Sequence, residues 1–202
     1  MQVLYGIEED VLVGVIKDTF SDKPKAIDAN LEALQVGIDY AKENFKKEDN
    51  YYFERSDCND GKIIMEGNDA SALGNVYAGC TVVGWYPITP SSSLAESTEA
   101  YFKKYRKTAD GKNKFAVLQA EDELSSIGMV IGAGWAGARA MTSTAGPGIS
   151  LMSEFLGLAY YAEVPAVIYD VQRVGPSTGL PTRTQQCDIM MCATASHGDT
   201  KH

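Results

Sequence analysis

Three acidic side chains stand next to one another at residues 121–123, inside the segment QAEDEL of residues 119–124. The segment follows an apolar run and precedes a stretch with helical character. Negative charge at the start of a helix is stabilised by the helix dipole, which accounts for such acids without any ligand. A buried carboxylate that faces a ligand can instead share a proton with a heterocyclic nitrogen. The residues alone leave both roles open.

A second group with chemical potential is the turn YPITPSS at residues 86–92. Pro87 and Pro90 fix the backbone dihedral φ and remove two hydrogen-bond donors, so the turn is stiff. Thr89 lies between them with its hydroxyl free to project from a strand end. Serines 91–93 can cap the helix that follows. A capped turn needs less rigidity than this, so we interpret the segment as part of a ligand site, with a plain strand-to-helix turn as the alternative.

Two further segments follow apolar strands. Residues 142–148 (TSTAGPG) place backbone N–H groups at a helix start, where they can line a pocket or hold an anion. The sequence contains no phosphate-loop lysine motif and no G-x-G-x-x-G after a strand, so a nicotinamide site is unsupported. Arg173 directly follows the last apolar run, and a guanidinium there suits a bidentate carboxylate contact. A solvated loop arginine is the alternative.

A match to G-x-S-x-G occurs at residues 175–179, and Asp188 and His197 follow in the order found in hydrolases. Ser177 would be the nucleophile of such an enzyme. The motif needs a helix immediately after the serine, and Pro181 opposes one. A serine hydrolase is therefore the less favoured interpretation.

These groups must be held by a common scaffold, and the chain alternates apolar runs with amphipathic stretches. We predict an α/β fold with a doubly wound, mostly parallel sheet, because strands separated by helices form βαβ units. Such sheets bind ligands outside the carboxyl ends of their strands. The predicted strands are residues 62–65, 81–86, 115–119, 139–144 and 165–171, and the predicted helices are residues 69–80, 92–106, 123–138 and 149–162.

The first 61 residues have a different character. Residues 11–17 are rich in β-branched side chains and predict a strand, and residues 26–45 predict an amphipathic helix. One strand and one helix are too little to bury a core, so residues 1–45 are interpreted as a partial α/β domain. Residues 46–61 are polar and predict a linker. Residues 62–202 form the main domain, which we expect to be truncated at its C-terminal end.

Composition excludes several classes of protein. The chain has 202 residues, of which 45% are hydrophobic and 22% charged, and its net charge of −9 argues against a nucleic-acid surface. No apolar run approaches the roughly 18–20 residues of a membrane span, and no signal peptide is present, so a cytoplasmic protein without membrane contact is expected. The cysteines show no metal-ligand or iron–sulfur spacing, so we expect structural thiols and no metal site: Cys58, Cys80, Cys187 and Cys192.

The motifs in their order resemble one family. The chain from about residue 62 onward resembles the pyrimidine-binding domain of the α subunit of 2-oxoacid:ferredoxin oxidoreductases, with the 2-oxoglutarate type the nearest match. Residues 1–45 look like the end of the γ domain, which is fused ahead of α in some members. The segments that carry the resemblance are residues 67–74, 86–90, 121–123, 138–142, 145–148 and 172–183.

The resemblance implies a thiamine-diphosphate-dependent enzyme that oxidatively decarboxylates a 2-oxoacid, with 2-oxoglutarate expected, to an acyl-CoA and passes the electrons to ferredoxin. It also implies that the cofactor is shared with a β subunit. Mg²⁺ and 4Fe–4S clusters are expected on partner subunits, with coenzyme A and ferredoxin as partners of the whole complex. The isolated chain is not expected to turn over, and the alternative is an inactive cofactor-binding fragment.

The family's cofactor residues carry over by position. Glu123 matches the glutamate that hydrogen-bonds N1′ of the aminopyrimidine, and it is the expected catalytic residue. Counting back from Gly132 in the family pattern favours Glu123 over Glu121. Pro87 and Ile88 are expected to contact the cofactor.

The substrate residues carry over in the same way. Thr89 and Arg173 match the residues that hold the carboxylate and keto oxygens of the 2-oxoacid, and Thr182 is expected to join them. A distal carboxylate such as that of 2-oxoglutarate needs a second cation. Arg183 is the candidate on this chain, and a lysine of the β subunit is the alternative.

Overall fold

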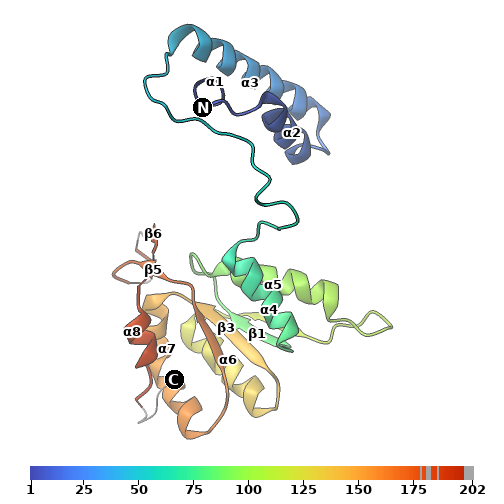
Figure 1. Cartoon of the computed structure of the whole chain (residues 1–202). Helices are drawn as coiled ribbons and strands as arrows, with labels where there is room; N and C mark the ends of the chain where they lie inside the picture. The colour runs from blue at the N-terminus through green and yellow to red at the C-terminus, as the bar shows by residue number, and fades with distance from the viewer. Residues whose placement is uncertain (178, 181–182, 186, 198–202) are drawn as a thin grey trace. The chain divides into compact units, whose positions relative to one another are not determined.

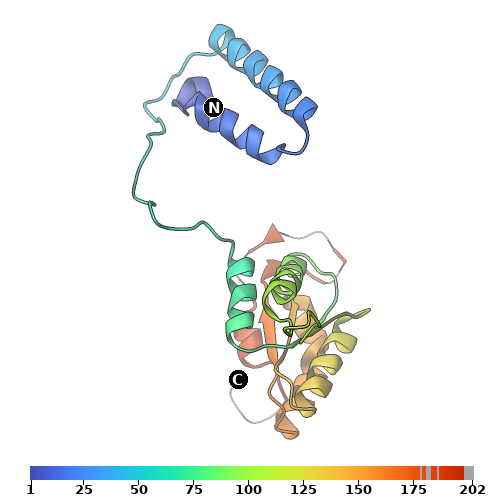
Figure 2. The same ribbon diagram turned by 90° about the vertical axis from the view of Figure 1, so that its right-hand side faces the viewer.

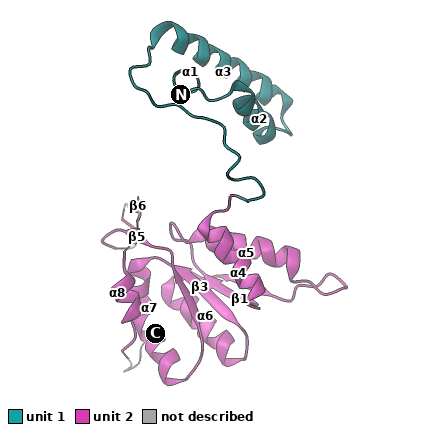
Figure 3. Ribbon diagram, viewed as in Figure 1, with its two compact units in different colours: residues 1–63 teal, residues 64–202 magenta. Residues whose placement is uncertain are grey.

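The computed structural model describes residues 1–177, 179–180, 183–185 and 187–197 (Figure 1). The chain divides into two compact units, residues 1–63 and residues 64–202, which Figure 3 shows in different colours. The two units differ in secondary structure, because the first contains helices and the second contains a sheet with helices. Among the described residues, no helix is long and apolar enough to cross a lipid bilayer.

The first unit contains helices only, α1 (Gln2–Tyr5), α2 (Glu9–Thr19) and α3 (Pro24–Asn44), with α1 and α2 both packed on α3 (Figure 3). The predicted strand at residues 11–17 is therefore wrong, since these residues lie inside α2. Leu12 and Ile16 are one helical turn apart and half-buried, whereas Val15 is exposed. A strand here would have no partner for its backbone groups within residues 1–63, and helix formation satisfies those groups internally.

The expectation of a partial α/β domain at residues 1–45 is corrected by the same observation. Helix packing, rather than a strand, buries the apolar side chains of this region. Acidic Glu9 and Asp10 at the start of α2 and Lys17 near its end complement the helix dipole, a signal that outweighs the β-branched composition.

No helix or strand occurs between Phe45 and Glu66. The predicted strand at residues 62–65 is absent, because no neighbouring strand pairs with it and Ile64 is 99% exposed. Part of this segment packs on the first unit. Arg55 Nη2 lies 2.5 Å from Glu8 Oε2, and Phe53 N donates to Tyr5 O at 2.7 Å.

The second unit is organised by a four-stranded sheet in the order β2-β1-β3-β4, and every neighbouring pair is parallel. The prediction of an α/β fold with a parallel sheet is confirmed. Because the strands are parallel, all their carboxyl ends lie at one edge of the sheet. The strands are β1 (Val82–Trp85), β2 (Ala116–Gln119), β3 (Ala140–Thr144) and β4 (Val167–Asp170).

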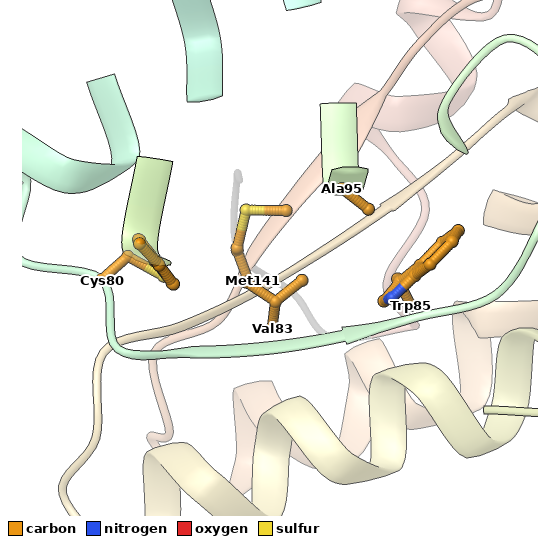
Figure 4. Packing of buried hydrophobic residues seen from close by; sticks show 6 residues of the cluster. Cys80, Val83, Trp85, Ala95 and Met141 are labelled. Carbon is orange, nitrogen blue, oxygen red and sulfur yellow. The ribbon is translucent and has the colours of Figure 1, made fainter. Parts of the chain in front are cut away.

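Helices cover both faces of the sheet (Figure 2). Val83 and Trp85 point from β1 toward a core that includes Ala95 of the next helix, and Figure 4 shows these side chains on one side of the strand with Met141. Tyr86, one position on, belongs to a second core on the other face. Helices α4 (Gly67–Tyr77) and α5 (Ser92–Tyr105) lie on the first face, and α6 (Glu123–Trp135) and α7 (Gly146–Tyr161) on the second.

Helix α6 lies unusually close to the sheet. A Cβ added at Gly84 would lie 2.9 Å from Ser126 O of α6 and 3.2 Å from Met129 Cβ, which leaves no room for a side chain on this face of β1. A Cβ added at Gly128 of α6 would lie 3.3 Å from the ring of Phe155 on α7. The small residues of α6 thus serve close packing, and they fix the distance between the start of α6 and the end of β1.

The chain continues beyond β4 with two short strands and a helix. Strands β5 (Arg173–Val174) and β6 (Arg183–Thr184) form an antiparallel pair, and α8 (Ile189–Ala193) follows. The segment returns to the edge where the parallel strands end, because Arg173 donates a hydrogen bond to the carbonyl of Thr89 after β1.

Candidate active site at the sheet edge

The order of the strands marks one place on the sheet edge. From β1 the chain moves outward to β2, then crosses back to β3 on the opposite side. Connections of opposite direction open a crevice outside the carboxyl ends of the two central strands. Tyr86 directly follows β1 and Thr144 ends β3, and their hydroxyl oxygens lie 2.7 Å apart. Two buried side chains thus meet at this switch point.

The three acids at residues 121–123 have three different surroundings. Asp122 is the N-cap of α6, and its Oδ1 accepts a hydrogen bond from Ser125 N at 2.8 Å. This bond holds the pKa of the Asp122 carboxyl below its ordinary value. Glu121 is exposed, whereas Glu123 is only 5% exposed. Capping accounts for Asp122 and leaves Glu123 as the carboxylate buried at the sheet edge.

Tyr86 connects the acid to the strand ends. Burial raises the pKa of the Tyr86 hydroxyl well above its ordinary value. A hydrogen bond from Thr144 opposes this rise in pKa. The negative charge of Glu123 and the hydrogen bond from Tyr86 to Glu123 both add to the rise. The positive charge of Arg173 acts in the lowering direction. The Tyr86 phenol is thus protonated at neutral pH, and the charges of Glu123 and Arg173 act on its pKa in opposite directions.

Gly148, in the first turn of α7, is the point on which these groups converge. A Cβ at this position would overlap Thr144 Oγ1, lie 2.6 Å from Tyr86 Oη and lie 3.2 Å from Glu123 Cγ. The missing side chain therefore allows three side chains from three strand ends to meet. Any larger residue would force at least one of them away.

Arg173 provides the positive charge of the site. Its side chain is 4% exposed, its Nη1 donates to Thr89 O at 3.0 Å and its Nη2 donates to Ser177 O at 3.2 Å. Its Nε has no hydrogen-bond partner among the described residues. A buried guanidinium with unused donor capacity suits an anionic oxygen.

The turn after β1 is braced from within. Ile88 N donates to Ser92 Oγ at 3.0 Å, and Ser91 Oγ donates to Ile88 O at 3.2 Å. The predicted helix cap by serine is absent, because these hydroxyls bind the turn instead of the first N–H groups of α5. Pro87 and Thr89 are exposed, Ile88 is half-buried, and the Thr89–Pro90 peptide bond is cis.

The remaining residues predicted for the substrate site or for a hydrolase are Thr182, Arg183, Ser177 and His197. Thr182 lies outside the described residues. Arg183 is an exposed residue of β6. Ser177 is exposed between β5 and β6, and the next helix among the described residues, α8, begins only at Ile189. Among the described residues that follow Ser177, the strand-to-helix turn that a hydrolase nucleophile needs is not found, and the ring centroid of His197 lies 6.0 Å from that of Tyr161.

A thiol and acid cluster at the end of β4 has no counterpart in the expectations from sequence. Cys187 Sγ donates to Asp188 Oδ2 at 2.8 Å, and Cys192 Sγ donates to Asp170 Oδ2 at 3.3 Å. The hydrogen bond to Asp188 is the main cause that raises the pKa of Cys187 to about 11, and burial is the main cause that raises that of Cys192 to about 12. Within the described residues, no group of three or more potential ligands is arranged for a metal ion.

Sequence reasoning also missed Tyr86, Thr144 and Gly148 as one group. The signal was present in two parts: strand alternation places Tyr86 on the same face as Gly84, and Gly148 is a second glycine in the first turn of a helix. Neither part shows that the residues touch, because the contact depends on the register of β1 and β3.

Comparison with known protein families gives a consistent match. The family described as pyruvate flavodoxin/ferredoxin oxidoreductase, thiamine diphosphate-binding, matches residues 73–201. The α subunit of 2-oxoacid:ferredoxin oxidoreductase 2 from Aeropyrum pernix is 38% identical over 209 residues, covering 98% of this chain and 32% of that protein. The KorA subunit of 2-oxoglutarate synthase from Methanocaldococcus jannaschii is 48% identical over 136 residues, covering 67% of this chain and 35% of that protein.

A solved structure agrees with these matches. The 2-oxoglutarate:ferredoxin oxidoreductase from Magnetococcus marinus, solved with 2-oxoglutarate, coenzyme A and succinyl-CoA bound, superposes with a TM-score of 0.80 at 39% identity. The match covers 99% of this chain and 34% of that chain. The chain thus spans about a third of the length of these relatives.

Proposed function

This chain belongs to the pyruvate flavodoxin/ferredoxin oxidoreductase family, in its thiamine-diphosphate-binding part, and we propose that it forms part of the α subunit of a 2-oxoacid:ferredoxin oxidoreductase that acts on 2-oxoglutarate. The observation that carries the proposal is the buried carboxylate of Glu123 beside the β1/β3 switch point. A buried carboxylate at this place can share a proton with a heterocyclic nitrogen of a ligand.

The residues at this edge fit thiamine diphosphate. Glu123 offers a carboxylate in a nearly dry environment, which suits a proton shared with the aminopyrimidine N1′. Pro87 and Ile88 offer apolar surface beside it on the stiff turn after β1. We propose that a partner subunit holds the diphosphate end of the cofactor.

Thiamine diphosphate, when bound, supplies the carbon nucleophile and the electron store for oxidative decarboxylation. In our proposal Glu123 holds the proton at N1′. Arg173, with its unpaired Nε, binds the carboxylate of the 2-oxoacid. Thr89, whose carbonyl is fixed by Arg173, presents its hydroxyl to the same substrate, and Thr182 is the expected fourth member.

The substrate and partners follow from the relatives. Two of the matched proteins carry 2-oxoglutarate in their names, which supports 2-oxoglutarate as the substrate here. Exposed Arg183 is the candidate for the distal carboxylate. A β subunit is proposed as the second half of the cofactor site. Coenzyme A, ferredoxin, Mg²⁺ and 4Fe–4S clusters are proposed at the level of the complex, and residues 1–45 as the end of a γ-type domain.

The test uses the complete α subunit that carries this sequence, co-expressed with its β partner. We expect reduction of a redox dye that requires thiamine diphosphate, coenzyme A and 2-oxoglutarate together. Cofactor binding without 2-oxoglutarate turnover would contradict the substrate assignment, and turnover independent of thiamine diphosphate would contradict the family role. The chain alone is expected to be inactive.

A second measurement addresses the distal carboxylate. In the complex, Arg183→Met is expected to lower kcat/KM for 2-oxoglutarate and to leave that for pyruvate nearly unchanged. An equal loss with both substrates would exclude a distal-carboxylate role for Arg183.

A further inference from the structure

The hydroxyl of Tyr86 lies where the elements of the site converge, and no part of the proposed chemistry yet uses it. Tyr86 is 4% exposed, which means that its hydroxyl needs hydrogen-bond partners from the protein. Its Oη lies 2.7 Å from Thr144 Oγ1 across the two central strands. A Cβ added at Gly148 would lie 2.6 Å from this oxygen and 3.2 Å from Glu123 Cγ, so the two side chains converge on one position.

The direction of the hydrogen bonds follows from charge. A phenol has one hydrogen to donate, and an ionised carboxylate is a stronger acceptor than a neutral hydroxyl. The Tyr86 hydrogen therefore goes to Glu123, and Thr144 donates to the Tyr86 oxygen. The effects on the pKa of Tyr86 agree with this order, because the bond to Glu123 raises it and the bond from Thr144 lowers it.

We propose that Tyr86 is a positioning residue for Glu123, and that its hydroxyl, itself oriented by Thr144 and admitted by Gly148, holds the Glu123 carboxylate in place for the aminopyrimidine. The inference rests on the proposed function. It adds to that function a donor that stabilises the ionised carboxylate before the cofactor binds.

The charged groups around this hydroxyl come from two elements. Glu123 of α6 and Arg173 of β5 act on it in opposite directions. Gly148 of α7 leaves room for this hydroxyl, and the carboxylate of Asp188 lies against Gly146 of the same helix. A change in the Tyr86 hydroxyl is thus expected to act mainly on Glu123.

The matched pair of variants is Tyr86→Phe and Tyr169→Phe. Each removes one phenol hydroxyl from the same sheet, and the Tyr169 hydroxyl donates to Asn75 Oδ1 at 2.9 Å on the other face. The complete α subunit with its β partner carries each variant, and the dissociation constant of thiamine diphosphate is measured as a function of pH. Thiamine-dependent turnover and the melting temperature are recorded in parallel.

The proton shared by Glu123 and the cofactor determines the direction in which Tyr86→Phe should shift the pH dependence of thiamine diphosphate affinity. Glu123 and a neutral N1′ need one proton between them, so the affinity for thiamine diphosphate falls at high pH. Without the Tyr86 donor, the ionised carboxylate is less stable relative to the acid. The pH at which affinity begins to fall should therefore move upward in Tyr86→Phe by about one unit, the scale of one hydrogen bond to a charged group.

Tyr169→Phe should leave this pH unchanged, and Thr144→Val should move it in the same direction by less. Thr144→Val also serves if Tyr86→Phe fails to assemble. A Tyr86→Phe complex that only melts earlier, with the pH dependence of wild type, would overturn the positioning role. A wild-type complex that neither binds the cofactor nor turns over would overturn the proposed function together with this inference, whereas wild-type turnover with an unshifted Tyr86→Phe overturns the inference alone.

Discussion

Two buried polar clusters in the second unit are built from similar side chains and differ in charge. In the interior cluster, Asn75 Nδ2 lies 2.9 Å from Met141 Sδ, and the Asn75 side-chain oxygen accepts from Tyr169. Every member of that cluster is neutral. In the edge cluster, two groups of opposite charge act on the pKa of Tyr86, which Glu123 raises and Arg173 lowers.

The difference shows how the two clusters are used. A neutral network whose members satisfy one another specifies packing and needs no ligand. Buried charges cost more than they return unless they are fully paired. The edge cluster retains a guanidinium nitrogen without a partner among the described residues, whereas the interior cluster has no such atom there. The charged cluster is therefore the one arranged to receive another molecule.

Among changes to the groups around Glu123, the largest effect is expected from Gly148→Ala. The new methyl would overlap Thr144 Oγ1 and displace the groups beside Glu123, so thiamine-dependent turnover of the complex should fall about 100-fold, the cost of a misplacement near 1 Å. Gly132→Ala is the control, because a Cβ there meets nothing within 4 Å. That variant should keep its activity and gain about 0.5–1 kcal/mol in the free energy of unfolding of the chain. Equal activity in both variants would show that Gly148 is an ordinary helix residue.

Arg173→Met should have the next largest effect. It removes the buried cation, and kcat/KM for the 2-oxoacid should fall about 10- to 100-fold, the cost of one charged hydrogen-bond partner. Thiamine diphosphate affinity should change little. Arg139→Met removes an exposed arginine that binds Ala78 O at 2.5 Å and should leave both constants unchanged. If Arg173→Met lowered only the affinity for thiamine diphosphate, Arg173 would bind the cofactor and not the substrate.

Asn75→Leu tests the interior cluster. The substitution leaves the Tyr169 hydroxyl without its acceptor, so the free energy of unfolding should fall by about 1–3 kcal/mol. Cofactor affinity of the folded complex should stay at the wild-type value. A loss of affinity without a loss of stability would mean that the two clusters are coupled, which contradicts the division drawn above.

The last prediction concerns Cys187 near β4, whose thiol donates a hydrogen bond to Asp188. With its pKa raised to about 11, Cys187 has little thiolate at pH 8, and thiolate is the reactive form. Its alkylation should be on the order of 100-fold slower than that of a thiol with the ordinary pKa, and should accelerate as the pH approaches 11. Exposed Cys58 is the internal standard, followed by mass spectrometry. Equal rates for Cys58 and Cys187 would show that Asp188 does not hold the Cys187 proton.

The second unit could be predicted largely from sequence, and the first only in its long helix, because the helix predicted at residues 26–45 is confirmed as α3. Alternation of apolar runs and helices between residues 81 and 171 determines a parallel sheet, because each strand there has a partner. Residues 11–17 have strand composition but no neighbouring strand, and packing on α3 decides for helix. Burial of Glu123, which follows exposed Glu121 and capping Asp122, could not be predicted from composition, because it depends on Asp122 being the N-cap of α6.

The central claim is that Glu123, and not another acid of residues 121–123, serves the cofactor. The most direct measurement compares thiamine-dependent turnover in complexes carrying Glu123→Gln and Glu121→Gln, two isosteric changes two residues apart. The account predicts a loss of at least about 1,000-fold for Glu123→Gln and wild-type activity for Glu121→Gln, with unchanged melting temperatures, consistent with the scale of general acid–base catalysis. An active Glu123→Gln complex, or an equal loss in both, would contradict it.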